Sequence, residues 1–385
     1  MTSLPVSAPP AAATNHQEAA LADSSRGYLP TLDGWRAIAV VMVIVGHAVR
    51  GGSCGADGGS PWCSYALLGG HGVAIFFGIS GFLICARLLE EVRIRGALSL
   101  RGFYLRRAFR ILPPVMLYLT VIAVLTMTLD LPVTKPEWIA ALLFVRDYVG
   151  WHAQGWYTGH LWSLSVEEKY YLLWPLFFVR LSSRRLLSVS LAVALLVTSW
   201  RLFDGHVGLT VRWFDLPLWT NNLRWDTRID ALACGAAAAL LLQARETRER
   251  LAQSLRGAGQ YALLLALVGF LAVAPRLRPG VSSAIEAVLV PALLVSTVFL
   301  PATRFGRLLE SPLLRWVGRV SYGLYLWQQL FLPERGTNHL GWLQEFPGNI
   351  TMTVLCATAS YYVMERPLIR LGHRLATPAT PGRLT

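Results

Sequence analysis

The sequence is poor in charged residues, and lysine is almost absent. Only 15% of its 385 residues are Asp, Glu, Lys or Arg, whereas soluble globular chains carry about 25%. Lys135 and Lys169 are the only lysines, and the formal net charge is +13. Because 54% of the residues are hydrophobic, the chain is neither disordered nor able to bury its apolar residues in one soluble core. The sequence therefore predicts an all-α, polytopic integral membrane protein.

Motifs for binding metals, nucleotides or nucleic acids are also missing. The five cysteines form no paired CxxC motif and no HxxxH spacing occurs, so we expect no metal site. No Walker motif or GxGxxG sequence opens a helix, which argues against ATP-driven transport. The basic residues fall in short bursts between apolar runs, and this pattern excludes nucleic acid as a partner. Cys54 and Cys63 share a predicted outer loop, where a disulfide and two free thiols both remain open.

Ten runs are apolar and long enough for transmembrane helices, which need about 20 residues. They lie near residues 34–50, 68–88, 108–128, 161–180, 186–203, 223–243, 260–275, 281–301, 318–333 and 347–365. Three of the cysteines fall within these runs, where a buried thiol usually acts as a small hydrophobe.

The distribution of arginine predicts the topology. Arginine-rich segments alternate with the apolar runs, at 87–110, 180–185, 245–256, 304–319 and 366–383. Basic loops stay on the cytoplasmic side, and these segments share one side only if a weaker apolar stretch, 137–150, does not cross. We therefore predict about ten transmembrane helices, both termini cytoplasmic, and 137–150 lying flat or re-entrant. Residues 1–30 and 373–385 are predicted to be disordered tails of a transmembrane domain at 31–372.

The first apolar run carries two ionisable residues, Arg36 and His47. They are eleven residues apart, so they share nearly one helix face at a separation of about 16 Å along the axis. Ionisable side chains within a span are functional candidates, and an imidazole can act as an acid or base near neutral pH. The alternative is that Arg36 anchors the helix in the lipid headgroups and His47 is a polar cap at the interface.

The run that begins near residue 161 holds three adjacent charges, Glu167, Glu168 and Lys169, towards its outer end. One of the carboxylates could orient the His47 ring and stabilise its protonated form. Pairing of a glutamate with the neighbouring lysine is the alternative. The two glutamates point about 100° apart on a helix, and the sequence does not choose between them. His160, just before this run, is expected to lie at the membrane interface.

Arg106, Arg107 and Arg110 are candidates for binding an anionic donor. Arg107 and Arg110 are three residues apart, so they are neighbours on one helix face, and guanidinium groups suit phosphate. For Arg106 in particular, plain anchoring by the positive-inside rule is the alternative. Ser80 lies between two glycines in a span, where a ligand or a neighbouring helix can approach closely.

Alternating charges precede another span at Arg224, Asp226, Arg228 and Asp230. We predict that they line the mouth of an acceptor cleft together with Trp162. Mutual salt bridges at the outer membrane boundary are an equally simple explanation. The aromatic-rich stretch 320–334 is typical either of an interface belt or of a wall on which sugars stack.

Taken together, these stretches resemble the membrane acyltransferase-3 family over about residues 28–372. The landmarks occur in the family's order as LDGWRAIAVVMVIVGHA, FFGISGFLI, RRAFRILPP, HLWSLSVEEKYYLLWP, RIDALACG, SYGLYLWQQ and YYVMERPLIRL. The resemblance implies a ten-helix membrane enzyme that moves an acyl group, usually acetyl, from acyl-CoA to a hydroxyl. It implies acyl-CoA as a co-substrate and no permanently bound cofactor. Acceptors in the family are sugars of surface polysaccharide, lipopolysaccharide or peptidoglycan, or secreted small molecules such as macrolides.

The resemblance also implies roles for individual residues. His47 matches the essential histidine and Arg36 its motif partner; Arg107 and Arg110 match an RxxR pair linked to the donor, and both glutamates fall in the acidic motif. The sequence departs from the family at Ala74, where an acidic residue is frequent, and at Gln328, where a histidine is frequent. No hydrolase-like domain follows the last expected span, so we expect the stand-alone architecture.

We therefore predict a multi-pass enzyme of the cell inner (plasma) membrane that transfers acetyl from acetyl-CoA to a surface or exported glycan. His47 would act as general base, or through an acyl-histidine intermediate. A secreted small molecule is the alternative acceptor. A proton-coupled transporter or flippase, and a scaffold protein, are the rival functions. The expected partners are acyl-CoA, a carbohydrate or small-molecule hydroxyl acceptor and the lipid bilayer.

Overall fold

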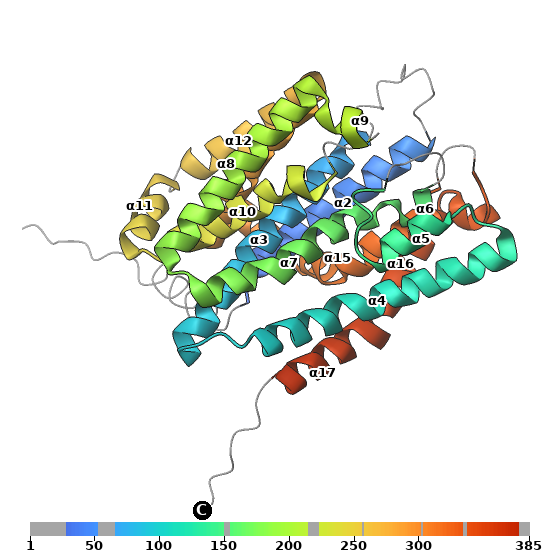
Figure 1. The fold of residues 1–385 in the computed structure, drawn as a ribbon, viewed down its shortest axis with the longest axis horizontal. Helices are drawn as coiled ribbons and strands as arrows, with labels where there is room; N and C mark the ends of the chain where they lie inside the picture. The colour runs from blue at the N-terminus through green and yellow to red at the C-terminus, as the bar shows by residue number, and fades with distance from the viewer. Residues whose placement is uncertain are drawn as a thin grey trace, which may run out of the picture.

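The computed structural model describes residues 28–52, 66–149, 155–214, 223–255, 258–301, 303–333 and 337–376. Every regular element within these ranges is a helix, as predicted (Figure 1). The loop with Cys54 and Cys63 lies outside the described residues, as does the predicted N-terminal tail up to residue 27.

Six described helices are long and apolar enough to cross a membrane. They are α2 (Pro30–Gly52), α3 (Leu68–Arg95), α4 (Leu100–Leu129), α8 (Ser183–Val207), α12 (Ala258–Val273) and α13 (Pro279–Phe299). A bent pair, α10 (Trp225–Leu241) and α11 (Arg245–Leu255), adds a seventh if the two helices form one span across their 106° bend. The chain is a multi-pass membrane protein, but the predicted count of ten is not confirmed.

The three remaining predicted runs are helical as well. They form α7 (Leu161–Arg180), α15 (Pro312–Phe331) and α16 (Gly348–Ala359). Helix α7 carries three consecutive charged residues in its middle, and α16 has 12 residues before a π-helical turn, η5 (Ser360–Glu365). The three charges keep α7, and the short length keeps α16, out of the set of helices that could span lipid by composition alone.

The outer surface of the helix bundle is apolar. Leu195 and Leu196 on α8 are each 68% exposed, and Leu265 on α12 is 72% exposed. A contiguous apolar surface of this kind is unfavourable in water and favourable against acyl chains. These side chains therefore mark a lipid-facing side of the bundle.

The centre of the fold is the contact of α3 with α2 and α10, and of α2 with α15 (Figure 1). Gly81 on α3 lies against the Leu232 carbonyl of α10, and Gly318 on α15 lies against the Asp33 carbonyl of α2. A methyl group at either glycine would overlap the facing backbone. Small residues thus let these helices pack closely, as membrane helices commonly do.

The stretch 137–150 does not form a spanning helix. Its helix, α5 (Lys135–Leu142), has eight residues, too few to cross a bilayer. Arg146 then folds back into the protein, where its buried guanidinium bonds to Glu137 at 3.3 Å and to the carbonyls of Val149 at 2.8 Å and Gly155 at 3.2 Å. This charge is an internal anchor for the loop before the short helix α6 (Trp156–Gly159).

The first and last described helices differ from the predicted tail boundaries by one residue and by four residues. Helix α2 already begins at Pro30, and the last helix, α17 (Arg366–Ala376), includes four residues that we had assigned to a disordered tail. Helix α17 lies along α4 (Figure 1), with Gly372 against the Phe109 side chain and Ala376 buried. Packing against α4 therefore orders this end of the chain; residues 377–385 lie outside the described part.

Candidate active site

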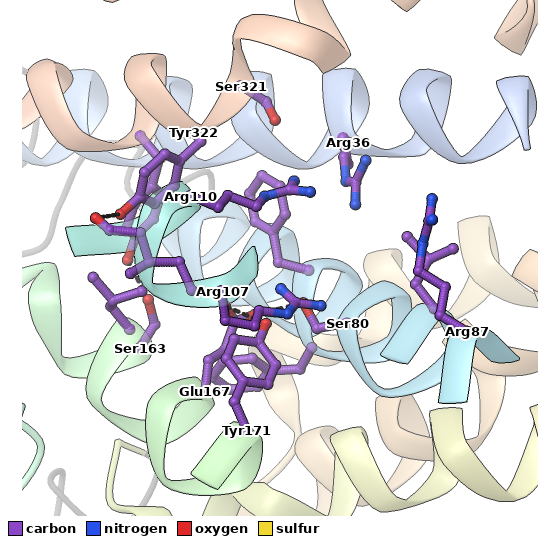
Figure 2. A pocket seen from close by; sticks show the side chains of 16 residues that line it. Arg36, Ser80, Arg87, Arg107, Arg110, Ser163, Glu167, Tyr171, Ser321 and Tyr322 are labelled. Carbon is purple, nitrogen blue, oxygen red and sulfur yellow. Dashed lines mark hydrogen bonds between the residues drawn. The ribbon is translucent and has the colours of Figure 1, made fainter. Parts of the chain in front are cut away.

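A pocket between α2, α3, α4, α7 and α15 gathers many of the predicted residues (Figure 2). It encloses about 950 Å³, including a part open to solvent. Its polar lining consists of Arg36, Ser80, Arg87, Arg107, Arg110, Ser163, Glu167, Tyr171, Ser321, Tyr322 and Tyr325. Its apolar lining consists of Phe76, Phe77, Leu83, Ile111 and Leu164.

Helical periodicity explains how the sequence builds this lining. Ser163, Glu167 and Tyr171 are spaced by four residues on α7, so they lie one above the other on a single face. Arg107 and Arg110 are three residues apart on α4, which gives them a common face in the same way. The predicted donor pair and one predicted carboxylate therefore meet in one cavity.

Four arginines enter the pocket from three helices (Figure 2). Arg36 Nη1 lies 3.2 Å from Asp33 Oδ1, and the Arg107 guanidinium lies 4.4 Å from the centre of the Tyr171 ring. Arg110 is solvent-exposed. Among the described lining residues Glu167 is the single carboxylate, so positive charge dominates and the pocket suits an anionic ligand.

Glu167 organises the polar side of the pocket. Ser80 Oγ donates to Glu167 Oε1 at 2.8 Å, and the Tyr171 hydroxyl donates to Glu167 Oε2 at 2.9 Å. Since the Tyr171 ring in turn packs on Arg107, the carboxylate fixes the aromatic surface that holds this arginine. The glycine-flanked Ser80 thus lines the pocket and is bonded to an acid.

The other two charges of that triplet do not line the pocket. Glu168 Oε1 is buried and has no hydrogen-bond partner among the described residues. Lys169 pairs with Asp147, in the loop after α5, and not with a neighbouring glutamate. The alternative of an internal Glu–Lys pair was therefore wrong, because the loop brings its own carboxylate to the lysine.

His47 lies on α2, three turns beyond Arg36, and is not part of the pocket lining. Its Nδ1 is 3.0 Å from Gln328 Oε1 on α15, and its ring meets the Trp156 ring edge-to-face at 5.7 Å. Glu167, one of the two carboxylates predicted to orient this ring, bonds to Ser80 and Tyr171. Orientation of His47 by Glu168 stays a prediction.

His160 is buried within the protein, and its position at the membrane interface stays a prediction. The residue is 2% exposed, and its ring sits between the rings of Tyr118, at 5.2 Å, and Tyr325, at 5.5 Å. The Tyr325 hydroxyl donates to the His160 carbonyl at 2.7 Å. Both ring nitrogens of His160 lack a hydrogen-bond partner within the described chain.

Arg106, predicted as a donor ligand, points elsewhere. Its Nη2 lies 2.7 Å from Glu91 Oε2, and it does not line the pocket. Arg87 on α3 lines it instead, a residue that the sequence indicated only as part of a basic segment.

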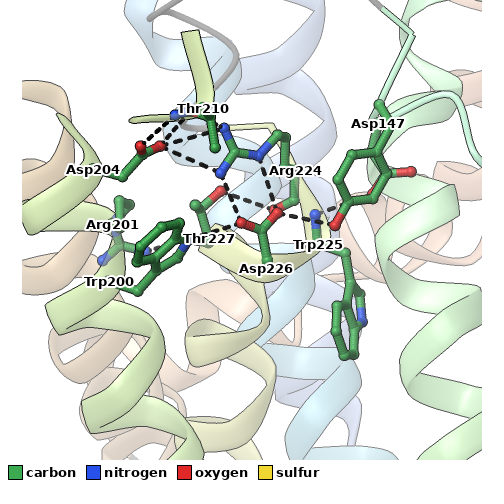
Figure 3. Close-up of polar contacts among 10 residues, drawn as sticks. Asp147, Trp200, Arg201, Asp204, Thr210, Arg224, Trp225, Asp226 and Thr227 are labelled. Carbon is green, nitrogen blue, oxygen red and sulfur yellow. Dashed lines mark hydrogen bonds and ion pairs between the residues drawn. The ribbon is translucent and has the colours of Figure 1, made fainter. Parts of the chain in front are cut away.

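Arg224 and Asp226, which we predict to line an acceptor cleft, belong to an ion-pair network around the buried Arg224 (Figure 3). The guanidinium of Arg224 is 2.7 Å from Asp226 and 3.4 Å from Asp204 on α8. Tyr148 and Trp200 also donate to Asp226, each at 2.9 Å. Burial and the Asp226 charge raise the pKa of the Tyr148 phenol, which lies in a loop.

The other two members of that set are paired as well. Arg228 donates to Ser283 at 2.6 Å and lies 3.8 Å from Glu286, while Asp230 lies 2.8 Å from Arg201. Trp162 is buried against Phe77, with ring centres 6.0 Å apart. None of these predicted cleft residues lines the described pocket. The four charged residues form ion pairs, which was the alternative explanation.

The pocket contains tyrosines and serines that the sequence did not single out. Tyr171 and Ser163 lie four residues on either side of Glu167, and this spacing was the available signal. Tyr322 and Tyr325, which belong to the aromatic-rich stretch noted at 320–334, line the pocket together with Ser321. In the described part of the chain, no group of three or more His, Cys, Asp or Glu residues is placed to hold a metal ion.

Comparison with known proteins adds independent information. A family model described as "Acyltransferase domain" matches residues 29–364. A Staphylococcus aureus (strain COL) protein named "Putative O-acetyltransferase" is 25% identical over 373 residues, covering 90% of this chain and 58% of its own length. Peptidoglycan O-acetyltransferase OatA of Listeria monocytogenes serovar 1/2a is 26% identical over 336 residues, covering 79% of this chain and 49% of its own length. The chain thus spans about half the length of these relatives. No solved structure matches it.

Proposed function

The chain belongs to the acyltransferase-domain family, and from this membership and the pocket we propose that it is a membrane O-acyltransferase. It transfers an acetyl group from acetyl-CoA to a hydroxyl of a surface or exported glycan. The names of the similar proteins, which include a peptidoglycan O-acetyltransferase, support both the reaction and a glycan acceptor.

The arginine-lined pocket carries this proposal. Coenzyme A bears several phosphates, and arginine binds phosphate through planar, charge-assisted hydrogen bonds. Four arginines against one carboxylate in the lining leave an excess of positive charge for such a ligand. The apolar wall beside them, which includes Phe76, Phe77 and Leu83, suits the thin pantetheine arm.

The positive-inside rule supports an orientation for the pocket. Arg87, Arg107 and Arg110 belong to the most arginine-rich segment of the chain, which we place at the cytoplasmic face with both termini and ten crossings of the inner membrane. Donor then arrives from the cytoplasm. His47, about 16 Å further along α2 than Arg36, lies towards the exported acceptor.

His47 is the proposed general base. It takes the proton of the acceptor hydroxyl as the hydroxyl oxygen attacks the thioester carbonyl carbon. The carbon–sulfur bond then breaks, and the imidazolium returns the proton to the departing thiolate. Base catalysis of this kind contributes about 10²–10⁴-fold to the rate.

The test is acetyl transfer by the full chain in liposomes, with radiolabelled acetyl-CoA and a soluble peptidoglycan fragment or a macrolide as acceptor. We expect His47→Ala to lower kcat by about 10²–10⁴-fold. His206→Ala, at the exposed end of α8, is the matched control and should retain activity. Transfer at the wild-type rate by folded His47→Ala would contradict the base, and absence of transfer to any acceptor by wild type would contradict the function. Preferential labelling of the macrolide would reassign the acceptor.

A further inference from the structure

Gln328 is a buried residue in contact with His47. It is fully buried on α15, one turn beyond the pocket-lining Tyr325. Its Oε1 lies 3.0 Å from His47 Nδ1. An amide oxygen accepts hydrogen bonds and cannot donate them. The contact therefore requires the proton on Nδ1 and leaves the lone pair of the neutral ring on Nε2.

The remaining atoms of this region include unsatisfied donors. Gln328 Nε2 has no hydrogen-bond partner in the described part of the chain, and neither ring nitrogen of His160 has one. His160 is near enough to His47 for their charges to interact. Buried polar groups in folded proteins nearly always have hydrogen-bond partners, so unsatisfied groups at one place indicate that a polar ligand binds there.

The same residues continue the pocket by one to three turns. Gln328 follows Tyr325 by three residues on α15, and His160 precedes Ser163 by three at the start of α7. On α2, His47 follows Arg36 by eleven residues. These spacings keep each pair on a common helix face, so the three elements that line the pocket also bring His47, His160 and Gln328 together beyond it.

We propose that Gln328 is the positioning residue of His47 and that its amide N–H group binds the reacting carbonyl oxygen. This inference rests on the proposed acyl transfer. The amide oxygen holds the ring in the tautomer whose Nε2 takes the hydroxyl proton. The amide nitrogen donates to the carbonyl oxygen as the acceptor oxygen adds and negative charge develops there. When the carbon–sulfur bond breaks, the carbonyl re-forms and the proton on Nε2 goes to the thiolate.

The first experiment compares Gln328→Met with Gln329→Met in the liposome assay. Methionine keeps the length of the side chain and removes both amide functions. We expect kcat of Gln328→Met to fall by about 10²–10³-fold, with KM for acetyl-CoA unchanged because the arginines are intact. Gln329 is equally buried and adjacent, but it points about 100° away from Gln328 around α15, so its variant should stay within about twofold of wild type. Equal losses in both variants would overturn the proposal.

The second experiment distinguishes positioning from mere packing. Gln328→Glu retains an acceptor for Nδ1–H and adds a negative charge, which favours the protonated imidazole. The acid limb of the pH profile of kcat/KM should therefore move to higher pH by about one unit. An unmoved limb in an active variant would contradict the contact with His47.

A third measurement does not depend on catalysis. ¹⁵N NMR of histidine-labelled protein, with His47→Ala used to assign the resonance, reports which ring nitrogen carries the proton. We expect an Nδ1–H tautomer in the wild type and its loss in Gln328→Met. An Nε2–H tautomer in the wild type would overturn the positioning role even if acyl transfer is observed. An Nδ1–H tautomer in a protein without acyl transfer would instead refute the proposed function and leave the contact standing.

Discussion

Two regions of this membrane protein contain arginines and carboxylates, and they differ in how the charges are balanced. In the α8–α10 network, Arg224 lies between Asp204 and Asp226 and is 1% exposed. In the pocket, four arginines share the lining with one carboxylate, and one of them, Arg110, is exposed to solvent. The two regions contain the same residue types at similar spacings in the sequence. They differ in the ion-pair partners of their arginines and in the exposure of those arginines.

The difference shows how a buried charge can be assigned to structure or to binding. A paired charge has its desolvation offset by its partners, so it holds helices in place and has little left to offer a ligand. An excess of one sign beside a cavity retains an unsatisfied field, and a ligand of the opposite sign is attracted by it. On this basis we expect the network to maintain the fold, and the proposed function assigns donor binding to the pocket.

The largest effect is expected from breaking the network. Arg224→Met would leave the buried Asp204 and the half-buried Asp226 without their cation. Removing one partner of a buried pair costs about 3–5 kcal/mol of unfolding free energy. The apparent Tm in detergent should fall by about 5–10 °C. Thermal unfolding followed by tryptophan fluorescence measures this.

Arg248→Met, on the exposed helix α11, is the control for that experiment and should leave Tm unchanged. The protein that remains folded in Arg224→Met should keep its KM for acetyl-CoA. A raised KM without a loss of Tm would place Arg224 in the donor site and would remove the distinction between the two regions.

Much of the fold could be predicted because periodicity and hydropathy are local properties. All ten predicted runs are helices, and the short segment after Lys135 does not span. The number of crossings could not be confirmed from composition, since α7 carries three adjacent charges. Of these, Glu167 bonds to Ser80 on α3 and Lys169 to Asp147 in the loop after α5. The sequence did not predict that helix α17 continues to Ala376. This end of the helix is ordered by packing against α4, and a local sequence pattern does not indicate which helices pack together.

The site was predicted in part. Arg36, Ser80, Arg107, Arg110 and Glu167 do line one pocket, because helical spacing places them on facing surfaces. The sequence did not indicate that an amide from α15 contacts His47, and the contact with a carboxylate from α7 stays a prediction. Sequence distance gives no information on such a contact, which joins residues 281 positions apart. The charges at 224–230 were misassigned because alternating signs fit a cleft and a network equally well.

A smaller effect is expected from the pocket arginines. Arg107→Ala combined with Arg110→Ala removes two charge-assisted contacts, each contributing about 1.5–3 kcal/mol in favourable cases. Solvent access at Arg110 lowers that contribution, so we expect KM for acetyl-CoA to rise by about 100-fold, with Tm within about 2 °C of wild type. Initial rates at varied donor concentration give KM.

Arg106→Ala is the matched control, since it removes the same side chain from the same basic segment. Arg106 pairs with Glu91 outside the pocket, so its variant should leave KM nearly unchanged. If replacement of Arg106 raises KM as much as replacement of Arg107 and Arg110, the basic surface in general and not the pocket attracts the donor. The proposed difference in function between the two regions would then be contradicted.

The smallest effect concerns ionic strength. Salt screens exposed charges over a Debye length of about 10 Å at 0.1 M and about 3 Å at 1 M, but it screens buried pairs much less. Raising KCl from about 0.05 to 0.5 M should therefore increase KM for acetyl-CoA by about two- to fivefold and leave Tm nearly constant. In the Arg107→Ala, Arg110→Ala variant the salt dependence of KM should flatten, because the screened charges are gone. If Tm falls with salt while KM rises, solvent ions reach the network as readily as they reach the pocket. Burial would then not explain the difference between the two sets of arginines.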